Sequence, residues 1–196
     1  MEKELPIFTA ALDLSPPWFI REVSFTNEGK DKVLHIFVDH EPGKKFEYDG
    51  DHYSVYDHHQ RTWQHLNFFQ HRCHLHARVP RVRLDDGKVK LVPIPWAQPG
   101  SSFTLLFEDE AVRLLQGGMS ASAAGNHLGI SDKRVFAIAQ RRVSHALTEQ
   151  PLQGVEDMSI DETSSRKGHN YLTVIGDRQA KKVVGLSIGK DADALA

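Results

Sequence analysis

The acidic pair Asp161-Glu162 has the residue types best suited to chemistry on a phosphate ester. It follows Ile160 in a short run that alternates between apolar and polar residues, which predicts a β-strand. Metal-dependent phosphoryl-transfer enzymes hold two metal ions with several carboxylates of this kind. An acid on an interior strand costs free energy unless it is paired or bound to a cation, so Asp161 is predicted as a metal-binding carboxylate. Glu162 points to the opposite face as its outward neighbour. Spacing alone favours an acid that ends a strand and accepts hydrogen bonds from a turn, and the Arg-Lys-Gly-His string that follows reverses this preference.

Basic residues follow this acidic pair along the chain. They are Arg166, Lys167 and His169, and on the residues alone they fit a charged turn that is exposed to solvent. The alternating patterns around these residues predict three consecutive strands, at residues 157–161, 169–177 and 181–188.

A predicted helix over residues 131–147 carries a second set of polar residues, and Ser131 can cap its start. The residues at helical spacing that are expected to form its buried stripe are Val135, Ile138, Ala139, Val143 and Ala146. Arg, Lys and Gln side chains contact phosphates and base edges in the major groove of DNA. The DNA contacts predicted on the opposite side are therefore Lys133, Arg134, Gln140 and Arg141. The alternative is an ordinary solvated helix face.

Two shorter helices are predicted before this one. The first spans residues 103–116, where the side chains expected to line one side are Leu106, Val112 and Leu115. Ser120 can cap the second, which runs to Leu128, and Gly129 supplies the positive φ expected just past a helix end. Three short helices separated by tight turns are typical of a helix-turn-helix.

The amino-terminal half has a period of two, which predicts strands. Residues 18–25 and 32–38 are expected to form a hairpin, and residues 88–92 a further strand. Residues 71–79 alternate strictly; the expected apolar face is Cys73, Leu75, Ala77 and Val79, and the expected polar face is Arg72, His74, His76 and Arg78. Three prolines and a glycine then predict a linker or a domain edge at residues 93–100.

The histidines are concentrated in this half, with nine of the twelve between His35 and His76. His58-His59 and the pair His74 and His76 have the spacing of metal ligands. His74 and His76 share their predicted face with two arginines, which repel a cation and suit a phosphate. We therefore expect an anion-facing surface here, with a metal cage as the alternative. The single cysteine, Cys73, is expected to be a core thiol.

Composition restricts the protein class only broadly. The chain has 196 residues, a net charge of −2, one cysteine and no long apolar run. These features predict a globular protein of the cytoplasm with no disulfide framework, no signal peptide and no membrane partner.

Several longer strings carry a resemblance to a known family. They are Arg61-Thr-Trp-Gln-His-Leu66, Ala77-Arg-Val-Pro-Arg-Val-Arg83, Val92-Pro-Ile-Pro-Trp-Ala97, Gly100-Ser-Ser-Phe-Thr-Leu-Leu-Phe-Glu108 and Ile160-Asp-Glu-Thr-Ser-Ser-Arg-Lys-Gly-His169. In this order they make the chain resemble the ISL-three class of bacterial insertion-sequence transposases, which are DDE-type enzymes.

The resemblance implies an α+β multidomain fold in three parts. Residues 1–97 would form a small β-rich module similar to a zinc ribbon, residues 98–150 a helix-turn-helix DNA-binding domain, and residues 151–196 the first strands of an incomplete RNase H-like domain. It also implies that Asp161 helps to position two Mg²⁺ ions for cleavage and transfer of DNA strands. It allows Arg166, Lys167 and His169 to contact the DNA backbone near that site, with a charged, solvated turn as the alternative. The implied partners are double-stranded DNA at the terminal repeats of the element and a second copy or a full-length transposase, at the bacterial nucleoid.

Two departures from the family pattern bear on function. Tyr48 and Leu84 stand where cysteines of the zinc site are expected, so zinc is expected to be absent. The later acidic residues of the DDE triad are not in the chain, so it is expected to be truncated and catalytically incomplete. Whether it is an enzyme is left open. The competing hypotheses are a DNA-binding module that competes with the full-length transposase and a gene remnant without activity.

Overall fold

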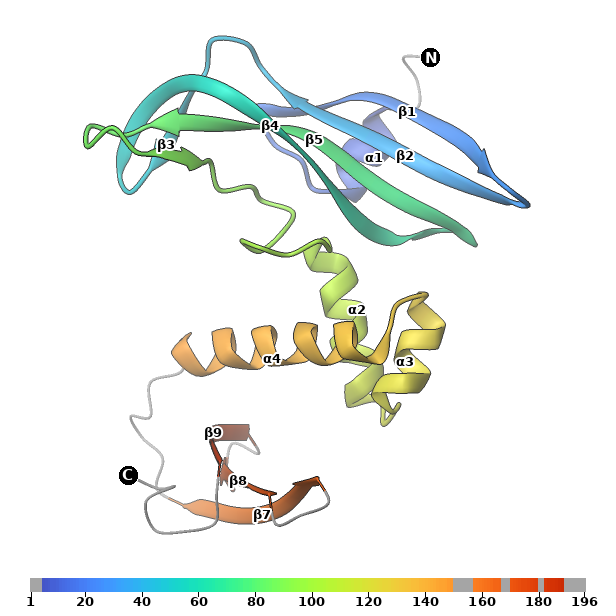
Figure 1. The fold of residues 1–196 in the computed structure, drawn as a ribbon, viewed down its shortest axis with the longest axis vertical. Helices are drawn as coiled ribbons and strands as arrows, with labels where there is room; N and C mark the ends of the chain where they lie inside the picture. The colour runs from blue at the N-terminus through green and yellow to red at the C-terminus, as the bar shows by residue number, and fades with distance from the viewer. Residues whose placement is uncertain (1–4, 150–156, 167–169, 180–181, 189–196) are drawn as a thin grey trace. The chain divides into compact units, whose positions relative to one another are not determined.

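The computed structural model describes residues 5–149, 157–166, 170–179 and 182–188 (Figure 1). The chain divides into two compact units, Met1–Gly129 and Ile130–Ala196. The first unit contains α1 (Leu5–Ala11), β1 (Trp18–Glu28), β2 (Asp31–His40), β3 (Lys45–Tyr48), β4 (Asp51–Phe68), β5 (His71–Arg83), β6 (Val89–Leu91), α2 (Leu105–Gln116) and α3 (Ala121–Leu128). The second contains α4 (Asp132–Glu149), β7 (Met158–Arg166), β8 (Asn170–Asp177) and β9 (Lys182–Ile188).

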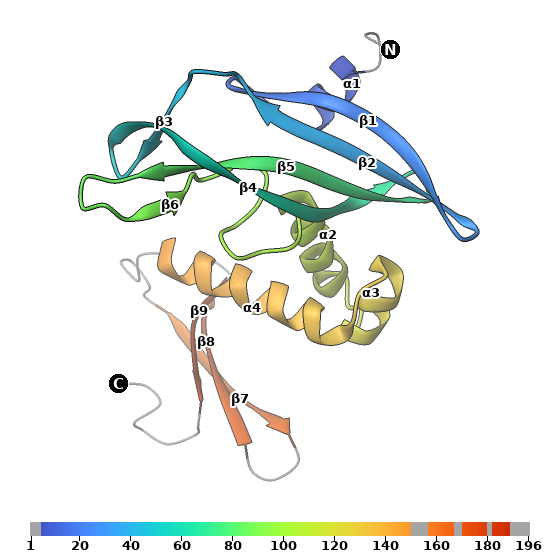
Figure 2. The same cartoon turned by 45° about the horizontal axis from the view of Figure 1, so that its top comes forward.

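The first unit is built on one six-stranded sheet with the order β1-β2-β5-β4-β3, and β6 pairs with the end of β5 (Figure 2). The hairpin of β1 and β2 and the strand β6 confirm the sequence predictions. The long antiparallel pair of β4 and β5 and the parallel pairing of β5 with β2 were not predicted. This parallel pairing places residues 33–38 beside residues 72–77, which lie far away in the sequence.

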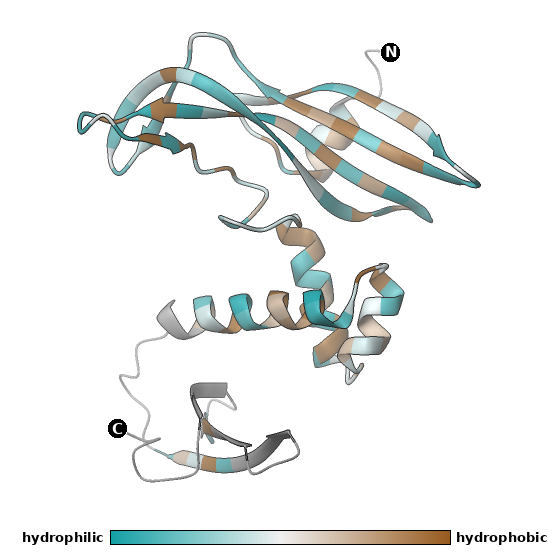
Figure 3. Ribbon diagram, viewed as in Figure 1, coloured by the Kyte–Doolittle hydropathy of each residue, from teal (hydrophilic) through white to brown (hydrophobic). Residues whose placement is uncertain are grey.

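Alternation along the central strands separates a buried face from an outer face. Figure 3 shows apolar and polar residues alternating along β2 and β5. On β5, the predicted apolar side chains Cys73, Leu75, Ala77 and Val79 are all buried, as expected for a strand with one face in a core. Cys73 is the predicted core thiol, and its burial raises the pKa of the thiol to about 12.

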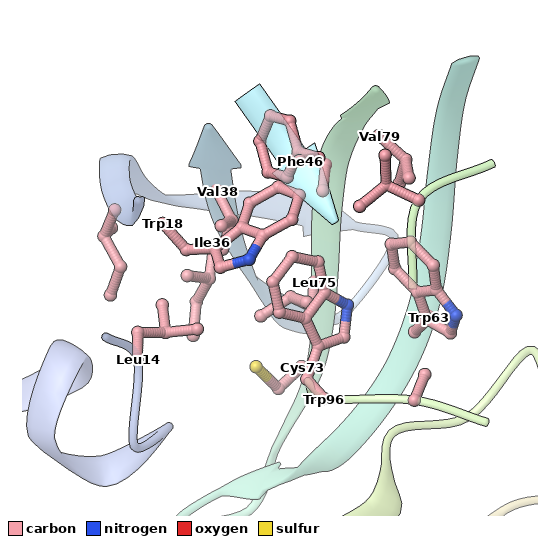
Figure 4. Packing of buried hydrophobic residues seen from close by; sticks show 14 of the residues in the cluster. Leu14, Trp18, Ile36, Val38, Phe46, Trp63, Cys73, Leu75, Val79 and Trp96 are labelled. Atoms are coloured by element: carbon pink, nitrogen blue, oxygen red, sulfur yellow. The ribbon is translucent and has the colours of Figure 1, made fainter. Parts of the chain in front are cut away.

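Three tryptophans hold the core of the sheet together (Figure 4). The centre of the Trp96 ring lies 4.9 Å from the ring centre of Trp18 and 5.8 Å from that of Trp63, and the ring is nearly perpendicular to both. Edge-to-face contacts of this kind add to the free energy of burial. Trp96 and Ala97 are each only 5% exposed. Residues 93–100 are irregular, as expected of a linker or domain edge, but Trp96 anchors this segment to the sheet.

Both α2 and α3 begin at a side-chain cap, and only that of α3 was predicted. Thr104 caps α2 by accepting a hydrogen bond from the Phe107 amide, and Ser120 caps α3 in the same way through the Ala123 amide. Gly129 ends α3 with φ of 70°, a left-handed conformation that favours glycine. The expected apolar side of α2 is partly wrong, because Leu106 is 45% exposed while Phe107 and Ala111 are buried.

The second unit begins with α4 and continues into an antiparallel sheet with the order β7-β8-β9. On α4, Val135 and Ile138 are buried and Ala139 is half-buried, as predicted. Val143 and Ala146 are exposed, so the predicted buried stripe covers only the first half of the helix. No helix in the described part of the chain is long and apolar enough to cross a membrane.

Candidate nucleic-acid interface

The start of α2 is joined to the edge of the sheet by backbone hydrogen bonds. The Gln64 amide donates to the Ser102 carbonyl at 2.9 Å, and the Thr104 amide donates to the Gln64 carbonyl at 3.1 Å. These two bonds form a parallel bridge between Gln64 and Phe103, two residues before the helix. The orientation of α2 is therefore set by β4 and not by a flexible connection.

A buried polar pair lies beneath this junction. The Ser101 hydroxyl donates to the Glu108 carboxylate at 2.6 Å, and both side chains are almost completely buried. Arg61 of β4 also donates to the Ser101 carbonyl at 3.2 Å. Buried polar groups are stable only with such partners, so this pair fixes the segment before α2 against its first turn.

His65 of β4 contacts the helix cap directly. Its Nδ1 lies 2.8 Å from the Thr104 hydroxyl, and burial lowers the pKa of His65 to about 4. The imidazole is therefore neutral at neutral pH, and with its proton on Nε2 it accepts the hydroxyl proton of Thr104. Nearby, the Gln64 side-chain amide donates to the Leu128 carbonyl at the end of α3, at 3.5 Å. One stretch of β4 thus positions both α2 and α3.

The predicted DNA-contacting residues of α4 lie on its accessible side. Lys133, Arg134 and Gln140 are exposed, and Arg141 is half-buried. The first turn of α4 is closed at the predicted cap position, where the Ser131 carbonyl accepts the Arg134 and Val135 amides at 3.0 and 3.2 Å. An exposed row of cationic and amide side chains on a helix can contact phosphates and base edges.

Asp161 lies on strand β7, opposite Val174 of β8, and its side chain is exposed. The predicted strand is therefore present, but the carboxylate does not lie in a buried sheet interior. Arg166 is the last residue of β7, whereas Lys167 and His169 lie outside the described residues. In the described part of the chain, no group of three or more His, Cys, Asp or Glu side chains is arranged to hold a metal ion.

The outer face of the sheet carries a hydrogen-bonded row of histidines that spans four strands. His35 Nδ1 lies 2.8 Å from His76 Nε2, and the two outer ring nitrogens contact the hydroxyls of Thr26 and Thr62 at 2.8 and 2.9 Å. The ring of His74 stacks on His35 at 5.9 Å. Burial lowers the pKa of both His74 and His76. The alternation of β5 predicted this face, whereas the contact between His35 and His76 depends on the parallel pairing of β2 with β5.

The residues at the expected zinc-ligand positions do not fit a zinc site. Tyr48 and Leu84, which stand where cysteines were expected, pack against the hydrophobic core of the sheet. Cys73 belongs to that core as well. A structural zinc site needs four thiolate or imidazole ligands in a tetrahedron. The apolar contacts of Tyr48 and Leu84 stabilise the two turns where ligands would otherwise be expected.

Two family models match the chain. The helix-turn-helix domain of transposase family ISL3 matches residues 92–143, which include α2, α3 and the first part of α4. The zinc-finger of transposase IS204/IS1001/IS1096/IS1165 matches residues 48–83, from Tyr48 through β4 and β5. The second match begins at Tyr48 and ends one residue before Leu84.

Two curated proteins are similar to the chain over 138 residues. Each is a transposase for insertion sequence element IS1557 from Mycobacterium tuberculosis, one from strain CDC 1551 / Oshkosh and one from strain ATCC 25618 / H37Rv, and each is 30% identical. The aligned region is 69% of this chain and 30% of each relative, so the chain matches less than a third of their length. No solved structure matches the chain. On the two family matches and this identity, the chain belongs to the ISL3 family of insertion-sequence transposases.

Proposed function

We propose that this chain binds double-stranded DNA at the terminal repeats of a mobile element through its helix-turn-helix. The observation that carries the proposal is the exposed row of Lys133, Arg134 and Gln140 on α4, inside the segment that matches the ISL3 helix-turn-helix. Arg141 is proposed as a phosphate contact beside this row. The site of action would be the nucleoid in the bacterial cytoplasm, with a second copy or a full-length transposase as protein partner.

The experiment that tests this proposal measures the affinity of the chain for a labelled duplex by fluorescence anisotropy. We expect the double variant Lys133→Ala and Arg134→Ala to bind at least about tenfold more weakly, since two phosphate contacts would be lost. The matched control is Lys44→Ala, which removes an exposed lysine from a turn of the sheet. Equal affinities of the double variant and the control would contradict the proposal.

We further propose that Asp161 is a Mg²⁺-binding carboxylate of an RNase H-like transposase domain, with Arg166 and Lys167 contacting the DNA backbone. Two metal ions need several carboxylates, and the described residues bring no such cluster together. The chain by itself would therefore bind DNA without cutting it, and could compete with a full-length transposase for element ends. Mg²⁺-dependent nicking of DNA by the chain would contradict the proposal that it does not cut. Loss of that nicking in Asp161→Ala would support the role of this carboxylate.

A further inference from the structure

A hollow of about 120 Å³ lies on the outer face of the sheet. Its lining residues belong to the strands and not to the helix-turn-helix segment. Side chains from four strands contribute to its lining, namely Arg21, Phe37, Gln60, Thr62, His76 and Arg78. Hydrogen-bond donors therefore predominate around it. Arg61 also borders the hollow, but its guanidinium donates to the Ser101 carbonyl and stacks on Trp63.

Two guanidinium groups share one carboxylate beside this hollow. Arg21 lies 3.6 Å and Arg78 lies 3.8 Å from the same oxygen of Asp39. Both distances are longer than a hydrogen bond, so these ion pairs are loose. The arginine side chains are 48% and 46% exposed, whereas Asp39 is only 13% exposed. The site therefore has one excess positive charge and two cationic groups that remain accessible.

Aromatic stacking orders one of these arginines. The guanidinium of Arg21 lies over the ring of Phe37, 5.8 Å from its centre. Phe37 in turn stacks on His76, with ring centres 4.7 Å apart and an angle of 19° between the planes. Stacking limits the rotation of an arginine without using its N–H groups, which stay available to an anion.

We propose that this hollow binds a phosphate group of the DNA backbone, held between Arg21 and Arg78 with Gln60 as a further donor. Arginine pairs are suited to phosphate because the planar guanidinium donates two parallel hydrogen bonds to oxyanions. The inference that the phosphate belongs to DNA rests on the proposed function. The sheet and helices α2 and α3 belong to one compact unit, and the Gln64 and His65 contacts join them. The sheet would offer DNA a sequence-independent phosphate contact of its own.

The test compares duplex affinity among variants of the full chain. The double variant Arg21→Gln and Arg78→Gln should bind about tenfold more weakly and lose roughly one unit of the salt slope per phosphate contact removed. Asp39→Asn should bind several-fold more tightly, because it removes the carboxylate that competes for both guanidiniums. The matched control is Arg72→Gln on the same face of β5, since Arg72 is already neutralised by Glu28 at 3.0 Å and Asp31 at 4.0 Å.

The outcomes separate this inference from the proposed function. If the α4 double variant weakens binding while the Arg21 and Arg78 variants match Arg72→Gln, the sheet site is overturned and the helix-turn-helix proposal stands. If Asp39→Asn weakens binding although its circular dichroism and thermal unfolding are unchanged, the sheet site is also overturned.

A second measurement distinguishes DNA phosphate from free phosphate. The amide NMR signals of Gln60, Thr62 and Arg78 would be followed during titration with a duplex and with inorganic phosphate at matched ionic strength. We expect the duplex to shift these signals at far lower concentration. Shifts caused by inorganic phosphate alone, with none from the duplex, would contradict a DNA contact at this hollow.

Discussion

A hydrogen bond of 2.8 Å between His65 and Thr104 joins the sheet of the first unit to α2, the first helix of the helix-turn-helix. The Thr104 oxygen also accepts the Phe107 amide at 3.4 Å, so the same hydroxyl caps α2 and holds it against β4. This double use requires a neutral imidazole that can accept the hydroxyl proton. The orientation of α2 is therefore linked to the protonation state of one histidine in the sheet.

Acidification should weaken the fold through His65. Its pKa is about 4 in the folded chain, below the value near 6.5 expected when unfolded, so the unfolded chain binds a proton first as the pH falls. The neutral His65 makes its full contribution to the free energy of unfolding above about pH 6.5. This contribution, at most about 3 kcal/mol, is lost as the pH falls towards 4. Urea unfolding at several pH values would measure this loss.

The matched variant for this measurement is His65→Asn, which keeps a hydrogen-bonding side chain but does not titrate. His58, His74 and His76 also have lowered pKa values because of burial, so some loss of stability at low pH should remain in the variant. The difference between the two proteins isolates His65. Identical pH profiles would show that His65 does not link the pH to stability.

The buried pair of Ser101 and Glu108 should be costly to break. Ser101→Ala removes the hydroxyl that donates to the Glu108 carboxylate at 2.6 Å in a site with almost no solvent access. Loss of a hydrogen bond to a buried charged or polar group costs about 1–3 kcal/mol in the free energy of unfolding. Ser102→Ala is the control, because the Ser102 side chain is exposed. Equal unfolding free energies in the two variants would refute this role.

The sequence predicted the elements whose patterns are local. The alternation of residues 71–79 defined both faces of β5, and the caps at Ser120 and Gly129 defined the limits of α3. Strand β4 was missed as an element because polar residues occupy both of its faces over much of its length, as in Asp57-His-His-Gln60. Its position follows from pairing with β5, which is a long-range property.

The candidate sites were predictable to different degrees. The polar side of α4 follows from helical spacing, and Lys133, Arg134 and Gln140 are exposed as expected. The roles of Asp161, Arg166 and Lys167 stay predictions. The contact of Arg21 with Asp39 and the contact of His35 with His76 each join different strands. Such contacts depend on strand register, which the pattern of a single strand does not determine.

Chelation should leave the sheet intact. Tyr48 and Leu84 pack on the core where zinc ligands were expected, so we expect hydrophobic burial and not a metal to stabilise this segment. We expect the thermal midpoint of the chain to change by less than about one degree in excess EDTA, and we expect no stoichiometric zinc by elemental analysis after purification. A large fall in the midpoint, restored by added Zn²⁺ and not by Mg²⁺, would contradict the absence of a zinc site.

The central claim is that α4 carries the main electrostatic contact with DNA, and the salt dependence of duplex affinity tests it most directly. Affinity should fall steeply with salt in the wild-type chain, and the slope of log affinity against log salt should become shallower by roughly two units in the variant with Lys133→Ala and Arg134→Ala. Lys44→Ala should retain the wild-type slope. A wild-type slope near zero, or an unchanged slope in the α4 variant, would contradict DNA binding through this helix.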